Sequence, residues 1–311
     1  MTTPETATNG WQPVEQNTTA PSIHSRHLGS ALEAKTIAEQ CDSPSSSYRL
    51  AFNDADFLMQ DELRHVRLQL EYLKPQQIME KYGVDATLVV FGSARFCAPE
   101  VAAAQLHQAQ LALAAAPNDD SAQQQVVLAQ RNVRNSRYYQ QARQFAQLVA
   151  QHNQQHKRHA LMIISGGGPG IMEAANRGAA DMGDKSIGLN IVLPHEQQPN
   201  PYITPEFCFR FHYFAIRKMH FLQRARALVA FPGGFGTLDE LFETLTLLQT
   251  GKANKVPVIL FGEAFWRRLI DFDLLVEEGL IHAADLQLLH FVDDAETAWR
   301  YIADYYQLPQ A

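Results

Sequence analysis

The segment ALVAFPGGFGTLDELFETL, residues 227–245, carries the clearest fold signal in the chain. A continuous apolar run ends in a glycine-rich turn, and apolar residues at helical spacing follow directly, which is typical of a buried parallel strand leading into a helix. Glycines let a phosphate approach the backbone without a Cβ clash, and free N–H groups at a helix N-terminus favour an anion. We therefore predict an anion-binding loop with a threonine hydroxyl as a further donor. Its residues are Gly233, Gly234, Phe235, Gly236 and Thr237.

A second loop of the same kind lies upstream, in LMIISGGGPGIMEAANRGA, residues 161–179. A tight turn without a ligand does not need three consecutive glycines, so we favour phosphate binding here as well. Neither loop has the lysine of a nucleoside-triphosphate loop, and the acidic residue of the dinucleotide fingerprint is not at its expected place. The second predicted loop comprises Gly166, Gly167, Gly168 and Gly170.

Strands and helices alternate around these loops. The run ATLVVFGSAR, residues 86–95, predicts the first buried strand, and Gly92 and Ser93 at its end are further binding candidates. The alternation predicts an α/β fold with a Rossmann-like, doubly wound parallel sheet, in which both glycine loops face one ligand at the carboxyl ends of the strands. Strands are expected at 160–164, 186–192, 207–211, 227–231, 256–261 and 288–292, and helices at 169–182, 213–224, 237–250, 263–277 and 294–305.

The N-terminal third of the chain differs in composition from the rest. Residues 1–48 are polar and poor in large apolar groups, so we expect a disordered or loosely ordered tail. Residues 49–84 predict a helical extension with an apolar stripe, in which Pro75 marks a break or a new helix start. The main domain is expected at 85–311, with a long helical insertion at 97–155 formed by helices 97–116 and 119–155. The predicted stripe consists of Leu63, Val66, Leu70 and Leu73.

Composition excludes several classes of function. The 311 residues carry a net charge of −7, which gives no global attraction for nucleic acid. Cys41, Cys97 and Cys208 are odd in number and far apart, which fits a reducing compartment, and no apolar run reaches the length of a membrane span. Without a secretion signal, we expect a cytoplasmic protein that binds no membrane. His212 and His220 lack plausible carboxylate partners, so we expect no metal.

Two pairs of adjacent charged residues flank the strand expected at 227–231. Arg217 and Lys218 lie on the helix expected before it, and the planar fork of Arg217 suits a phosphate or a base edge, although a solvated basic face is the alternative. Glu240 lies in the helix expected after it, at the mouth of the sheet. Asp239 points elsewhere around that helix, so we expect a cap or a solvated role for it.

Together these motifs resemble the Lonely Guy (LOG) family of nucleoside-monophosphate phosphoribohydrolases, once mislabelled as lysine decarboxylases. The family's signatures are matched at 166–172, 217–218 and 232–240, and GLNIVLPHEQ at 188–197 resembles the larger bacterial branch. The resemblance implies a hydrolase that cleaves the N-glycosidic bond of AMP or an N6-substituted (cytokinin) AMP to free base and ribose 5-phosphate. It also implies a homodimer or higher homo-oligomer. The choice of base stays open.

The resemblance also implies roles for individual residues. Arg217 and Glu240 would be catalytic, and Lys218 would help the 232–240 loop to hold the phosphate and ribose. Met172, Glu173 and Glu196 would lie near the nucleoside or its ribose.

Two alternatives compete with this enzymatic function. Pyridoxal-phosphate chemistry needs a lysine presented in a cofactor site, and Lys185 and Lys252 have no such context, so we expect no cofactor. A non-catalytic nucleotide or molybdenum-cofactor carrier of the same fold stays open, although a carrier has no need of an arginine–glutamate pair.

Overall fold

The computed structural model describes residues 30–39, 46–194 and 198–309. The chain divides into two compact units, Met1–Arg67 and Leu68–Ala311. In the smaller unit, α1 (Ala31–Ala38) begins with a capping box between Ser30 and Glu33 and has no buried residue. Most of the tail predicted for 1–48 lies outside the described residues. The unit also contains α2 (Ala55–Leu58) and the short 3-10 helices Ser46–Tyr48, Ala51–Asn53 and Asp61–Leu63.

Helix α3 (Arg64–Lys81) spans the boundary between the units and corrects two predictions. The helix continues through Pro75 instead of breaking there, and the side chains of Pro75 and Met79 are buried. Packing of this stretch onto the main domain offsets the hydrogen bond that a proline cannot donate. The predicted apolar stripe does not face the core, because Leu70 and Leu73 are 52% and 44% exposed.

The larger unit is built on one sheet of seven parallel strands, in the order β4-β3-β2-β1-β5-β6-β7. The strands are β1 (Thr87–Phe91), β2 (Met162–Ser165), β3 (Ser186–Ile191), β4 (Cys208–Phe211), β5 (Ala225–Ala230), β6 (Val258–Phe261) and β7 (Leu289–Val292). The sheet grows from β1 toward β4 on one side and from β1 toward β7 on the other, so the order reverses at β1. This confirms the predicted Rossmann-like α/β fold.

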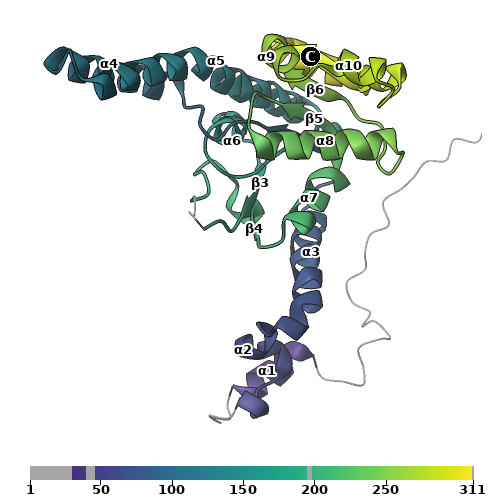
Figure 1. Cartoon of the computed structure of the whole chain (residues 1–311). Coiled ribbons are helices and arrows are strands. Elements are labelled where there is room, and N and C mark those ends of the chain that lie inside the picture. The colour runs from purple at the N-terminus through teal and green to yellow at the C-terminus, as the bar shows by residue number, and fades with distance from the viewer. Residues whose placement is uncertain (1–29, 40–45, 195–197, 310–311) are drawn as a thin grey trace, which may run out of the picture. The chain divides into compact units, whose positions relative to one another are not determined.

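Helices cover both faces of the sheet (Figure 1). Along β1, Leu88 and Val90 belong to one apolar cluster and Val89 and Phe91 to the other, as the two-residue period of a strand requires. The first cluster is covered by α5 (Asp120–Gln155), α6 (Ile171–Asp181) and α11 (Ala295–Tyr305). The second is covered by the end of α3 and by α7 (Phe214–Gln223), α8 (Phe235–Gln249), α9 (Glu263–Leu269) and α10 (Phe272–Glu277).

The helix expected at 263–277 is in fact two helices, α9 and α10. Ile270 and Asp271 are extended, and the Asp271 carboxylate accepts a hydrogen bond from the Leu274 N–H at 3.1 Å. The Asp271 side chain thus caps the start of α10, directly after the end of α9. The spacing of apolar residues does not reveal a capping hydrogen bond of this kind.

The two long helices expected at 97–155 are α4 (Pro99–Ala115) and α5. They pack side by side, and Figure 1 shows α4 and the first part of α5 reaching beyond the sheet. The second part of α5 packs on the sheet through Tyr139, Phe145 and Val149. Among the described residues, no helix is both long and apolar enough to cross a membrane.

Candidate active site

One cleft, of about 710 Å³, collects most of the predicted site residues. It lies where β1 is flanked by β2 and β5, the reversal point at which open parallel sheets bind ligands. Its volume suits a small organic ligand. The predicted residues that line it are Gly92, Ser93, Gly166, Gly168, Met172, Arg217, Gly233, Gly234, Phe235, Gly236, Thr237 and Glu240.

The loop that follows β1 joins the two glycine loops. The Ser93 N–H donates to the Pro232 carbonyl at 3.0 Å, and the Ser93 carbonyl accepts from the Ile171 N–H at 3.1 Å. Gly170 has a φ of +75°, and a Cβ there would lie 2.3 Å from the Ser93 carbonyl oxygen. A Cβ at Gly92 would lie 2.7 Å from the Ile171 side chain. Gly92 and Gly170 are therefore required for close packing of the loops.

Two other glycines open space for cleft side chains. A Cβ at Gly166 would lie 2.6 Å from Nη2 of Arg217 and 2.7 Å from the Met172 sulfur. Gly167 has a φ of +74°, and a Cβ there would meet the Asn190 amide at 2.5 Å. The glycine run thus leaves space for the side chains of Arg217 and Asn190 beyond the end of β2.

Arg217 is fixed at the floor of the cleft by α7. Its Nε donates to the Leu189 carbonyl at 2.7 Å, and its guanidinium lies over the Phe221 ring, 5.1 Å from the centroid. Burial lowers the pKa of Arg217, and the charge of Glu240 opposes that shift. The guanidinium is therefore a half-buried cation that interacts electrostatically with Glu240.

Glu240 is the buried acid of the cleft, with only 5% of the residue exposed. Burial raises its pKa to about 7, against the opposing charges of Arg217 and Lys218. An acid with this pKa exchanges a proton near neutral pH, as a general acid or base must. Strongly shifted acids in clefts are typical of functional sites.

The N-terminus of α8 also lines the cleft. A Cβ at Gly233 would lie 2.1 Å from the Thr237 hydroxyl oxygen, so the threonine packs directly over the glycine. No side chain caps this helix, and its dipole favours an anion at this end. Phe235, at the first helical position, is 93% exposed at the cleft.

Comparisons with known proteins identify relatives of this chain. A family model described as "Possible lysine decarboxylase" matches residues 172–302. The probable cytokinin riboside 5′-monophosphate phosphoribohydrolase LOG4 of Oryza sativa subsp. japonica is 30% identical over 142 residues, 45% of this chain and 60% of the rice protein. Cytokinin riboside 5′-monophosphate phosphoribohydrolase LOG1 of Arabidopsis thaliana is 30% identical over 152 residues, 48% of this chain and 70% of that protein. The chain belongs to the LOG family.

Solved structures with similar topology include two that bind the molybdenum cofactor. The carrier protein of Chlamydomonas reinhardtii is 23% identical, with a TM-score of 0.36 over 55% of this chain and 87% of the carrier. The cofactor-binding protein of Rippkaea orientalis is 18% identical, with a TM-score of 0.36 over 54% of this chain and 88% of that protein.

Two residues that the LOG resemblance implicated, Lys218 and Glu173, lie outside the cleft lining. The Lys218 ammonium lies 2.8 Å from an Asp239 carboxylate oxygen and 3.0 Å from one of Glu243, because one residue along α7 turns it about 100° from Arg217. The Glu173 carboxylate accepts a hydrogen bond from the Tyr139 hydroxyl at 2.7 Å. Glu196 lies outside the described residues.

The LOG cleft also contains residues outside the predicted binding set. Asn190 lies in β3, one residue before its end, and Arg95 lies four residues beyond the end of β1. The sequence signal for Arg95 is its place at the end of the apolar run 86–95. Asp239, expected to be solvated or a cap, is the partner of Lys218. The remaining lining residues are Phe91, Ala94, Ile191, Leu193, Phe214, Leu238 and Leu269.

A buried polar network holds the first glycine loop. Nδ2 of Asn200 donates to the Gly167 and Gly168 carbonyls at 3.2 and 3.1 Å and to the Asn176 side-chain oxygen at 2.9 Å. The Ser165 hydroxyl donates to the same Asn176 oxygen at 2.7 Å. Asn176 and Ser165 are fully buried, so these bonds fix the loop from behind.

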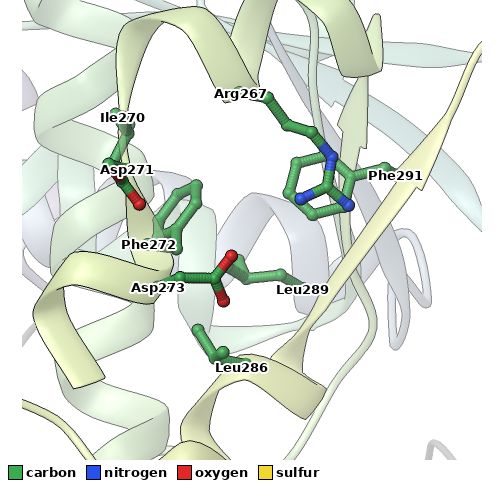
Figure 2. Close-up of a pocket in the computed structure, with 8 residues that line it drawn as sticks. All are labelled: Arg267, Ile270, Asp271, Phe272, Asp273, Leu286, Leu289 and Phe291. Atoms are coloured by element: carbon green, nitrogen blue, oxygen red, sulfur yellow. The ribbon is translucent and has the colours of Figure 1, made fainter. Parts of the chain in front are cut away.

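A second pocket, of about 470 Å³, lies beside α9, α10 and β7 (Figure 2). The Arg267 guanidinium lies 4.4 Å from the centroid of Phe291, and its Nε is 2.6 Å from a Glu263 oxygen. Asp271, on the pocket wall, caps α10 through Leu274. No predicted site residue lines this pocket, and these polar groups already serve protein contacts. The motif-bearing cleft is therefore the candidate active site.

Within the described residues, no group of three or more histidine, cysteine, aspartate or glutamate side chains is placed to hold a metal ion.

Proposed function

We propose that this protein hydrolyses the N-glycosidic bond of AMP or an N6-substituted AMP, giving free base and ribose 5-phosphate. The observation that carries the proposal is Glu240, a buried acid with a pKa raised to about 7, in the same cleft as Arg217 and two glycine loops. The names of the LOG relatives support it, since they are phosphoribohydrolases of a riboside 5′-monophosphate.

The phosphate of the substrate would bind at the N-terminus of α8. The backbone N–H groups of the loop and the Thr237 hydroxyl are donors suited to a phosphate. Binding energy from this remote group aligns the ribose over the buried acid. The unphosphorylated nucleoside should therefore be a much poorer substrate.

Glu240 would act at the sugar. Breaking the bond between C1′ and the base nitrogen leaves positive charge on the ribose, which the ionised carboxylate stabilises. The same carboxylate can take a proton from the water whose oxygen bonds to C1′. The electron pair of the broken bond leaves with the base, which gains a proton.

Arg217 would position the nucleotide and stabilise the departing base. Its guanidinium is fixed by the hydrogen bond to the Leu189 carbonyl and attracted by the charge of Glu240, so it is held in place before substrate arrives. A preorganised cation avoids reorganisation during the reaction.

The test is product analysis with AMP, GMP, CMP and isopentenyl-AMP as substrates. Free base and ribose 5-phosphate should appear together, and Glu240→Gln should retain nucleotide binding while losing most base release. Equal turnover by Glu240→Gln would refute the assignment. A tightly bound, unconverted nucleotide would instead support the carrier alternative.

We further propose a homo-oligomer in the cytoplasm. An apolar groove of about 360 Å³ between α3 and α7 supports self-association; its lining includes Leu73, Ile216 and Met219, and Leu73 and Met219 are exposed. Because α7 also carries Arg217, a partner seated there would border the cleft. Light scattering should give a mass above that of one chain, and Met219→Glu should lower it. A monomeric wild-type protein would refute self-association.

A further inference from the structure

We propose that Arg95 binds the phosphate of the substrate, in the role that the family resemblance implied for Lys218. The ligand class, a phosphomonoester, rests on the proposed function. The contribution of Arg95 to binding is a separate claim with its own readout.

The position of Arg95 follows from the topology of the sheet. Because β1 lies between β2 and β5, the loop after β1 runs between the two glycine loops. Ser93 ties this loop to both of them through Pro232 and Ile171. The Arg95 N–H donates to the Ser93 hydroxyl at 3.1 Å, which fixes the turn that carries the arginine. Arg95 therefore lines the cleft.

The charges of the cleft leave Arg95 uncompensated. The charged side chains among the described lining residues are Arg95, Arg217, Asp239 and Glu240. The Nε of Arg217 is bonded to the Leu189 carbonyl and its charge interacts with that of Glu240, while Asp239 pairs with Lys218 at 2.8 Å. Arg95 is exposed and has no ion-pair partner within the part of the chain that the structure describes. Arg95 thus presents an exposed guanidinium to an incoming anion.

A phosphomonoester needs such a cation here. It carries a charge of about −1.5 to −2 at neutral pH, and the chain as a whole has a net charge of −7. These negative charges repel one another. Backbone N–H groups alone leave that repulsion uncompensated, whereas a guanidinium offers both charge and a two-pronged donor.

The experiment compares Arg95→Met, which keeps the length of the side chain, with Arg95→Lys, which keeps its charge. Arg134→Met is the matched control, because Arg134 is an exposed arginine on α5 outside the cleft. Calorimetry on the full-length protein measures binding of ribose 5-phosphate and of inorganic phosphate. A second assay measures kcat/KM for AMP and for adenosine.

We expect Arg95→Met to weaken ribose 5-phosphate binding by about 10-fold or more, which is typical of losing a hydrogen bond between charged groups. Arg95→Lys should be intermediate and Arg134→Met should match the wild type. The ratio of kcat/KM for AMP to that for adenosine should fall in Arg95→Met. Unfolding temperatures equal to that of the wild type exclude misfolding of the exposed-site variants.

Unchanged ribose 5-phosphate binding in Arg95→Met would overturn the proposal, as would equal losses for AMP and adenosine. A wild-type protein with no saturable phosphate-dependent binding would overturn it too. Failure of the proposed function looks different: no base would be released from any nucleotide, yet ribose 5-phosphate would still bind in an Arg95-dependent way.

Discussion

The guanidinium of Arg217 occupies the space that a side chain at Gly166 would need, since a Cβ there would lie 2.6 Å from Nη2. The glycine loop at 166–170 therefore leaves room for the proposed catalytic arginine, which lies in a different part of the sequence. A glycine that phosphate binding alone would explain is also a steric requirement of the site.

This relationship predicts that Gly166→Ala lowers activity by displacing Arg217. The methyl group must push the guanidinium or the Met172 sulfur, both less than 3 Å away. We expect kcat/KM for the nucleotide to fall by about 10- to 100-fold, because small misplacements of catalytic groups are costly. Steady-state kinetics on the alanine variant measure this loss.

A double-mutant cycle with Arg217→Ala supplies the control. If Gly166→Ala acts through the arginine, the double variant should be hardly worse than Arg217→Ala alone. Additive losses would show that the alanine acts elsewhere.

The raised pKa of Glu240 predicts a pH-dependent cost to stability. Its pKa is about 7 in the folded protein and 4.5 as the ordinary value. Between these values the folded state holds more protons than the unfolded state, so the free energy of unfolding falls as pH rises. Glu240→Gln lacks this titration. Its stability relative to wild type should improve between pH 4.5 and 8 by on the order of 3 kcal/mol, as measured by urea unfolding at both pH values. A pH-independent difference would contradict the burial of an ionisable Glu240.

Sequence patterns predicted the fold well because they report local chemistry. Continuous apolar runs mark strands buried on both faces, and the glycine turns at 166–170 and 232–236 mark where strands become helices. The errors arose where one side chain decides between alternatives. Asp271 caps a helix that apolar spacing extends from 263 to 277, and burial carries α3 through Pro75.

The candidate site was less predictable, because its residues come together only in three dimensions. Gly92 and Gly170 fit a phosphate motif, yet their neighbours show that loop packing requires them. Lys218 stands next to Arg217 in the chain, but the helical turn directs it to Asp239. Arg95 reaches the cleft because β1 is central in the sheet. No local sequence pattern reveals the order of the strands.

The lowered pKa of His220 predicts that the protein loses stability in acid. Burial, followed by the charge of Arg224, lowers its pKa from 6.5 to about 4. The unfolded state therefore binds a proton first as pH falls, so the stability present above pH 6.5 is lost as pH falls toward 4. His220→Phe keeps a ring beside Tyr72 and Phe211. The variant should lose less stability than wild type over this interval, by on the order of 3 kcal/mol, in urea titrations at pH 6.5 and 4. Parallel losses in both proteins would contradict a neutral buried imidazole.

The hydrogen bonds of Asn200 predict that its side chain positions the first glycine loop for the ligand. Its amide bonds the carbonyls of Gly167 and Gly168 from behind, at 3.2 and 3.1 Å. Asn200→Asp replaces the donor with a carboxylate that repels both carbonyls, so it should raise KM for the nucleotide more than Asn200→Ala does, by about 10-fold or more. Kinetics on both variants at equal folded fraction provide the measurement. If the two variants lose only thermal stability and keep the wild-type KM, Asn200 supports the fold without positioning the loop for its ligand.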